Sequence, residues 1–411
     1  MASLLRRTRY VVTHLGPSVE AYYRRNYNSR PFRHRPVSLL PCDRARLGTA
    51  RAAPAPEMVH VANFGANAGD VLLPVVLRDL FSARVGPINW RARHAHDVVD
   101  ETAVTRFNRS AGIVVGGGGL FLSDTNPNQI SGWQWSCPTE ALDRITAPLA
   151  LFAVGYNQFR GHGDLGPLFR RNLEALARRA TYIGLRNTGS IDAVRALLPV
   201  DRQDVVRYQP CMTTLTGLLY PHLVQPATGE PVVAFNGAFD RSALRFGERR
   251  DEILGEVARA AARLAERAAI VVVLHVRDDA GLLPYFEAAG VPHRVVDLVG
   301  RPPVEVVRAW SAVTVAVGMR GHAQMIPFGC GRPIVSLASH DKLWYFLDDI
   351  GARDWGVELS DDDVAARIEA AVHTHLDDLS TSEARVVAAR RRLWDVSMAN
   401  VDELRAAWHL G

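Results

Sequence analysis

The feature that most constrains the fold is an alternation of short apolar runs with helical patterns, which occurs twice along the chain. In the first half, runs of strand length occupy 58–64, 111–115, 147–157 and 181–186, and helical patterns occupy 71–81, 165–180 and 187–198. In the second half, such runs occupy 231–237, 269–276, 292–298, 312–319 and 332–339, with helical patterns at 249–268 and 322–329. Short buried strands separated by helices are typical of parallel sheets covered on both faces. The sequence therefore predicts an α/β fold with two Rossmann-like domains whose parallel sheets face a cleft.

The length of 411 residues also favours two domains over one. A break in the pattern near 220–231 separates the two halves. We therefore expect a basic N-terminal arm at 1–55 without fixed structure, a first domain at 56–225 and a second domain at 230–355. The last segment, 356–411, is helical by pattern, and we expect it to pack back on the body.

Composition excludes several classes of protein. A hydrophobic content of 48% and a charged content of 22% are those of a soluble globular protein. No apolar run reaches the ~20 residues that cross a bilayer, and no secretory signal is recognisable at the start. The four cysteines lack the spacing of a metal site or a disulfide framework. The sequence thus predicts a cytoplasmic protein without a bound metal.

The net charge of +5 is concentrated in the arm, where eleven arginines face only Glu20 and Asp43. The remainder of the chain is slightly acidic, so we expect no nucleic-acid partner. One interpretation of the arm is a poorly ordered extension. The other is peripheral contact with anionic lipid at the inner face of the membrane, or with a lipid-linked acceptor.

The segment 312–329 places charged side chains at a strand end. The strand ends at Gly318, and Arg320 and His322 lie in the turn before the next helix. A helix N-terminus favours a phosphate or carboxylate, and an arginine can bind either anion through two hydrogen bonds. The alternative is structural: Arg320 pairs with a carboxylate and His322 caps the helix.

Two further cations occupy equivalent positions. Lys342, the only lysine in a chain with 48 basic Lys and Arg residues, follows the strand run 332–339. Arg186 follows the run 181–185 in the other domain. Cations at strand ends of both domains predict a two-sided anion clamp, although a surface arginine in a loop would look the same.

Two glycine-rich segments are expected to be turns between a strand and a helix. The first, "NFGANAGD", carries Asn67, Gly69 and Asp70, and the second, "VVGGGGLF", carries Gly117 and Gly118. Neither matches a phosphate loop or a dinucleotide fingerprint, but glycine allows a ligand to approach the backbone closely. Asp70 could accept a proton from a hydroxyl, or it could cap the following helix.

A loop after the second glycine segment carries Trp133 and Trp135. A tryptophan in a loop could stack on a sugar ring, or it could simply pack in the core. The sequence alone leaves both interpretations open.

The motifs together resemble those of the polysaccharide pyruvyl transferase family. The resemblance rests on "ANAGDVLL", "VVGGGGLF", "FAVGYN", "LRNTGS" and the Arg-Gly-His to Lys segment 320–342, and it covers roughly residues 58–355. It implies an architecture similar to B-type glycosyltransferases. It also implies transfer of pyruvate from phosphoenolpyruvate onto two hydroxyls of a sugar, in a polysaccharide, a glycolipid or a precursor, to form a cyclic ketal and release phosphate. High Arg and Ala usage is typical of GC-rich bacteria.

The resemblance also implies roles for single residues. Arg186, Arg320 and His322 would hold phosphoenolpyruvate, with His322 as the proton donor and Asp70 acting on the acceptor. Phosphoenolpyruvate is then a co-substrate, and no cofactor is expected. The first domain would bind the acceptor and the second phosphoenolpyruvate. The remaining candidates for substrate contact are Lys342, Asn67, Gly69, Gly117, Gly118, Trp133, Tyr156 and Asn157.

Two other functions fit the same fold. A glycosyltransferase with a nucleotide-sugar donor would need an acidic residue at the ribose, for which Asp240 and Asp278 are candidates. A sugar-binding protein without catalytic activity is the third hypothesis.

Overall fold

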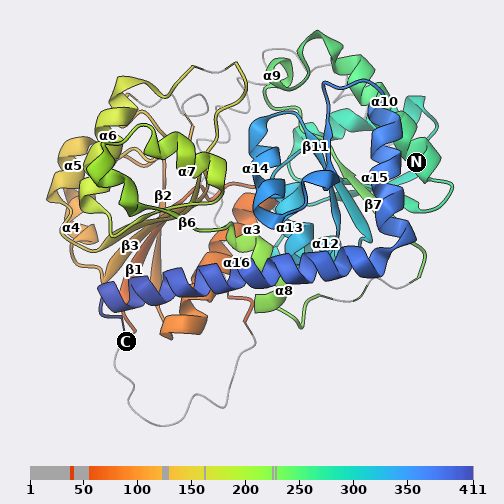
Figure 1. Ribbon diagram of the computed structural model, residues 1–411. Coiled ribbons are helices and arrows are strands. Elements are labelled where there is room, and N and C mark those ends of the chain that lie inside the picture. Colours follow the sequence, from red (N-terminus) through yellow and green to blue (C-terminus); the bar gives the residue numbers. More distant parts are fainter. Residues whose placement is uncertain are drawn as a thin grey trace, which may run out of the picture.

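Two six-stranded parallel sheets, one in each half of the chain, form the framework of the molecule (Figure 1). The computed structural model describes residues 38–40, 55–122, 129–161, 163–224, 226 and 229–410. The predicted N-terminal arm, 1–55, therefore lies outside the described residues except for 38–40 and residue 55. Within the described ranges, no helix is both long and apolar enough to cross a membrane.

The first sheet has the strand order β2–β1–β3–β4–β5–β6. Its strands are β1 Glu57–Ala62, β2 Asn89–His94, β3 Gly112–Phe121, β4 Leu149–Tyr156, β5 Ile183–Leu185 and β6 Val206–Tyr208. The helices of this half are α3 Ala68–Val85, α4 Glu101–Phe107, α5 Thr139–Arg144, α6 Gly166–Arg179 and α7 Thr188–Arg195. The half ends in the short helices η2 Val200–Val205, η3 Met212–Leu215 and α8 Thr216–Leu219.

Both expected glycine turns differ from the prediction. Strand β3 does not end before its glycines but runs through them to Phe121, since Gly116 and Gly118 pair with Phe152 and Val154 of β4. The two glycines adopt positive φ values of 142° and 98°. Helix α3 begins inside the first glycine segment and includes Asp70. The side chain of Asn67 caps α3 by accepting a hydrogen bond from the Gly69 N–H at 2.8 Å, so the capping role considered for Asp70 is wrong.

The second sheet has the order β12–β11–β10–β7–β8–β9. Its strands are β7 Val232–Asn236, β8 Ala269–Leu274, β9 His293–Asp297, β10 Val315–Gly318, β11 Ile334–Ala338 and β12 Gly356–Glu358. The helices are α9 Ser242–Phe246, η4 Gly247–Arg249, α10 Arg250–Leu264, η5 Arg277–Leu282, α11 Leu283–Ala288, α12 Pro303–Ser311, α13 His322–Gly329, α14 Asp341–Ile350, η6 Arg353–Trp355 and α15 Val364–Asp377. Because β12 belongs to this sheet, the predicted boundary at 355 falls one strand short.

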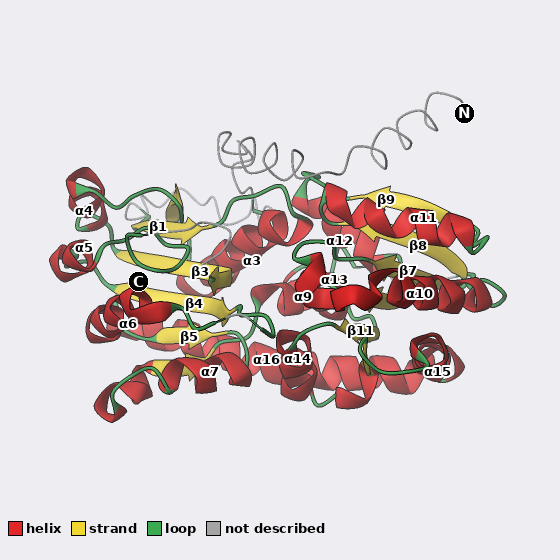
Figure 2. Ribbon diagram, turned by 90° about the horizontal axis from the view of Figure 1, so that it is seen from above, coloured by secondary structure: helices red, strands yellow, loops and turns green. Residues whose placement is uncertain are grey.

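The last helix, α16 Leu379–Ala407, crosses both halves of the molecule (Figures 1 and 2). Near its start, Arg385 pairs with Asp354 of the second half at 2.7 Å. Near its end, Asp402 pairs with Arg84 of α3. One buried apolar cluster also includes side chains from α3, α12, α13 and α16. The two halves therefore share a core where they meet.

The strand orders place a switch point in each sheet. Successive connections leave in opposite directions between β1 and β3 in the first sheet and between β7 and β10 in the second. Ligands of open α/β sheets bind beyond the carboxyl ends of strands at such points. The segments that follow β1 and β10 carry five of the predicted site residues: Asn67, Gly69, Asp70, Arg320 and His322. Arg186 and Lys342 follow other strands, β5 and β11.

Candidate functional site

The N-terminus of α3 and the N-terminus of α13 meet at the boundary between the two domains. A methyl group on Gly69 would overlap the imidazole of His322, so glycine is required for this approach. The Nε2 atom of His322 lies 3.7 Å from the thiol of Cys211, which is in the connection after β6. His322 of the second domain therefore packs directly on the first.

Arg186 is a buried cation that forms no ion pair with a carboxylate of the described residues. Its side chain follows β5 and lies over Gly155 at the end of β4, where a methyl group would overlap the guanidinium. The residue is 5% exposed, and its Nε has no hydrogen-bond partner. No carboxylate of the described chain forms an ion pair with it, and burial lowers its pKa. A buried cation of this kind is costly unless an anion joins it.

Lys342 lies in the first turn of α14 and is held across the domain boundary. Its Nζ donates to Oδ1 of Asn157 at 2.5 Å, and Asn157 follows β4 of the first domain. Within the described residues, no carboxylate pairs with Lys342. Burial, and then the charges of Arg186 and Arg245, lower its pKa well below the usual value. Lys342 and Arg186 thus form a positive site between the domains that no described carboxylate contacts directly, although the charges of Asp70 and Asp240 act on it from a distance. We call these two unpaired side chains the uncompensated cations.

Two titratable groups beside these cations have strongly shifted pKa values. Burial, together with Arg186 and Lys342, lowers the pKa of His322 to about 3, so the imidazole is neutral at pH 7. Burial raises the pKa of Asp70 to about 7, against the opposing charges of Arg320 and Arg186. Asn63 also donates a hydrogen bond to the Asp70 carboxylate at 3.0 Å. Shifted groups of this kind cluster at functional sites.

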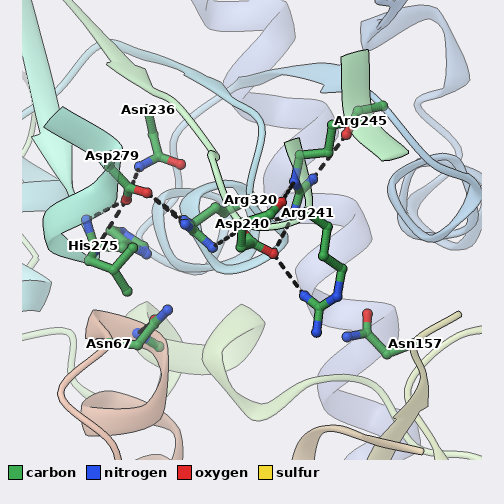
Figure 3. Close-up of polar contacts among 12 residues, drawn as sticks. Asn67, Asn157, Asn236, Asp240, Arg241, Arg245, His275, Asp279 and Arg320 are labelled. Atoms are coloured by element: carbon green, nitrogen blue, oxygen red, sulfur yellow. Dashed lines mark hydrogen bonds and ion pairs between the residues drawn. The ribbon is translucent and has the colours of Figure 1, made fainter. Parts of the chain in front are cut away.

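Arg320 forms ion pairs with two carboxylates (Figure 3). Its guanidinium pairs with Asp279 and with Asp240, each at 2.7 Å. Asp240 in turn contacts Arg241 and Arg245, at 2.9 and 3.0 Å. Although burial would raise the pKa of Asp240, these arginines hold it well below its usual range. The structural alternative for Arg320 is therefore the one observed, and the guanidinium is engaged before any ligand binds.

A cavity of about 260 Å³ lies beside this cluster. Arg160 lines it from the first domain, and Arg245, Ser339 and Glu358 are among the residues lining it from the second. Arg186, His322 and Lys342 do not line it. Of the two cations, Arg186 is buried and Lys342 is partly exposed.

The comparisons with known proteins agree with the motifs. A model of the family described as polysaccharide pyruvyl transferase matches residues 17–341. The chain belongs to this family. The match begins at residue 17, so it includes much of the arm that the motif comparison left out. A search of curated proteins finds no match.

Solved structures resemble this family member in fold. A putative UDP-N-acetylglucosamine 2-epimerase from Listeria monocytogenes has a TM-score of 0.52 and 11% identity, covering 81% of this chain and 91% of that chain. A UDP-GlcNAc 2-epimerase from Neisseria meningitidis, bound to UDP-GlcNAc, has a TM-score of 0.50 and 10% identity, covering 85% and 99%. The predicted fold of two Rossmann-like α/β domains is confirmed.

Several other predicted residues of this pyruvyl transferase family member have contacts within the first domain. Trp133 is fully buried and donates from Nε1 to Asn172 at 2.7 Å, so the prediction that it stacks on a sugar is wrong. The ring of Tyr156 packs with the outer core of the first domain. Gly117 packs against Leu73, whereas the position of a Gly118 side chain would be open.

Three further residues near the site were not predicted from the sequence. Asp279, not its exposed neighbour Asp278, is the buried partner of Arg320. Cys211 lies at His322 although its sequence surroundings give no signal. Phe159 stacks on His340 of the second domain at 4.4 Å, and its ring lies 4.9 Å from the guanidinium of Arg245. Only tertiary contacts identify these three residues.

Proposed function

We propose that this member of the polysaccharide pyruvyl transferase family transfers pyruvate from phosphoenolpyruvate onto two hydroxyls of one sugar. The product is a cyclic ketal on a polysaccharide, a glycolipid or a precursor, and phosphate is released. The observation that carries the proposal is the pair of uncompensated cations, Arg186 and Lys342, contributed by different domains.

The two cations suit the charge of phosphoenolpyruvate. The metabolite carries a phosphate and a carboxylate, so it can engage one cation at each end. Arg186 offers a planar fork of donors and Lys342 a compact point charge. In a buried site, such preorganised charges bind an anion more strongly than they would in water. Because Arg186 is almost fully buried, we expect the ligand to enter as the domains separate.

Arg320 has a different part in this proposal from the one that the resemblance implied. Asp240 and Asp279 hold the guanidinium of Arg320, which lies two residues after the end of β10 and two residues before His322. We therefore assign Arg320 to the positioning of the turn that presents His322. Direct contact with phosphoenolpyruvate is left to Arg186, His322 and Lys342.

The proton transfers can be assigned to His322 and Asp70. An acid protonates the methylene carbon of phosphoenolpyruvate, and the first sugar hydroxyl attacks the resulting cationic carbon while a base takes its proton. Departure of phosphate regenerates a cationic carbon, the second hydroxyl attacks it, and the proton of that hydroxyl leaves with phosphate. The sum is one ketal and one hydrogen phosphate.

The pKa values suit these roles once the ligand is bound. A carboxylate with a pKa of about 7 is an effective base near neutral pH, which favours Asp70 for the first hydroxyl. His322 is neutral in the free chain, but a neighbouring phosphate would raise its pKa and favour the imidazolium. Binding of phosphoenolpyruvate would therefore charge the group that donates the proton.

No observation favours a nucleotide-sugar donor. Asp240, the candidate for the ribose, is surrounded by Arg241, Arg245 and Arg320. The carboxylate of Asp240 is thus engaged by arginines of the protein itself rather than presented to a ribose hydroxyl.

Mass spectrometry of acceptor sugars incubated with phosphoenolpyruvate tests the proposal. We expect the mass of an added pyruvate ketal, together with stoichiometric phosphate, and loss of both in Arg186→Met and His322→Ala. Thermal shifts with phosphoenolpyruvate, UDP and GDP form the parallel binding test. Stabilisation by a nucleotide and none by phosphoenolpyruvate would favour a glycosyltransferase instead.

A further inference from the structure

Helix α14 belongs to the second sheet by connection, but its first turn is docked on the first domain. Arg160 of the first domain donates to Asp341 at 2.7 Å and to Glu358 at 3.0 Å. Phe159, the residue before it, is buried against His340, which immediately precedes α14. Residues of the first domain therefore contact the segment that bears Lys342.

The second half of α14 is docked on α7 of the first domain (Figure 1). The ring of Tyr345 lies directly on Gly189, where a methyl group would overlap it. Asp349 accepts hydrogen bonds from the hydroxyl and the N–H of Thr188, at 2.8 and 3.3 Å. Glycine in the first turn of α7 is unfavourable for a helix, and the contact with Tyr345 explains its presence.

This docking connects the two uncompensated cations. Helix α7 starts at Thr188, two residues after Arg186, and α14 carries Lys342 in its first turn. Arg186 and Lys342 come from different domains, so only contacts across the boundary can fix the distance between them. A ligand that bridges both cations is sensitive to that distance.

We propose that Tyr345 on Gly189 and Asp349 on Thr188 are positioning contacts that set the separation of Arg186 and Lys342, and thereby the affinity for phosphoenolpyruvate. The proposal rests on the proposed function. Neither Gly189 nor Tyr345 touches the ligand. Their effect passes through the placement of α14 against α7.

The test is Gly189→Ala, with rescue by a second change. The added methyl group is compatible with the helix but pushes the Tyr345 ring away. We expect the Kd for phosphoenolpyruvate, measured by titration calorimetry, to rise about tenfold or more. Gly189→Ala combined with Tyr345→Ala should restore most of the affinity, because the clash with the ring is removed and the hydrogen bonds of Asp349 with Thr188 still hold α14 against α7.

Gly112→Ala is the matched control. Its methyl group would overlap the indole of Trp408 in the same way, but at the start of β3, away from the cations. We expect a similar loss in Tm and an unchanged Kd. Equal weakening in Gly112→Ala, normal binding in Gly189→Ala, or failure of the double variant to recover would overturn the proposal.

The two proposals fail in different ways. If the unaltered chain binds no phosphoenolpyruvate, the proposed function fails. The docking contact can still be tested by measuring Tm. Gly189→Ala should lower the Tm of the unaltered chain, but it should have little effect on the Tm of a Tyr345→Ala protein. Additive losses would show that the two residues do not act through one contact.

Discussion

Replacement of Arg186 by methionine should stabilise the free protein and weaken its affinity for phosphoenolpyruvate. Arg186 is 5% exposed, its Nε lacks an acceptor, and no described carboxylate pairs with it. A buried, unsatisfied donor costs about 1–3 kcal/mol, and the unpaired charge adds to that cost. Methionine has a similar length and no charge, so the free energy of unfolding should increase by about 1–3 kcal/mol.

Ligand binding should change in the opposite direction. Loss of one partner from a buried, hydrogen-bonded charge pair costs about 2–5 kcal/mol. The Kd for phosphoenolpyruvate should therefore rise by about 30-fold to several thousand-fold. Urea unfolding gives the first quantity and titration calorimetry the second.

Arg332 provides the contrast within the same chain. It is 4% exposed, as buried as Arg186, but it donates to the Ser311 carbonyl at 2.7 Å and pairs with Glu383 at 3.2 Å. Arg332→Met should lower the free energy of unfolding by about 1–3 kcal/mol and leave binding unchanged. An Arg186→Met protein that is less stable than the unaltered chain, or that binds normally, would refute the idea of an uncompensated cation.

Three further outcomes follow from the same contacts. Because the pKa of Asp70 is about 7 when folded, above its ordinary value of 3.8, the chain should lose stability as pH rises between these values. Asp70→Asn should remove this loss of stability, which is measured by comparing urea unfolding midpoints at pH 5 and pH 8. The same difference between the two midpoints in Asp70→Asn as in the unaltered chain would contradict the raised pKa of Asp70. Binding of phosphoenolpyruvate at pH 7 should be accompanied by proton uptake by the protein, because the phosphate raises the pKa of His322. Calorimetry in buffers of different ionisation enthalpy measures the uptake, and none is expected in His322→Ala. Trp133→Phe should lower the free energy of unfolding by about 1–3 kcal/mol, because the buried Asn172 side chain loses its hydrogen-bond donor. The Kd for phosphoenolpyruvate should not change, and weaker binding of the acceptor sugar would show that Trp133 is a site residue after all.

The sequence predicts the parts of the site that depend on strand ends. Arg186 and Lys342 directly follow apolar runs, and the carboxyl ends of parallel strands meet at one edge of a sheet. That rule places both cations at the domain boundary without knowledge of any contact. The resemblance between the motifs and the family adds the expected ligand.

Long-range partners were not predictable in this way. Arg320 and its partner Asp279 are 41 residues apart, and Trp133 and Asn172 are 39 residues apart. No local pattern shows that one arginine at a strand end is neutralised and another is not. The glycines of β3 illustrate the same limit, since glycine permits both a turn and an irregular strand.

A crystal structure with phosphoenolpyruvate tests most directly whether two domains share one small anion. We expect the ligand between Arg186 and Lys342, with one acidic group within hydrogen-bond distance of each cation and with Arg320 still paired to Asp240 and Asp279. A ligand bound by residues of one domain alone, or one that displaces the carboxylates from Arg320, would contradict the proposed site.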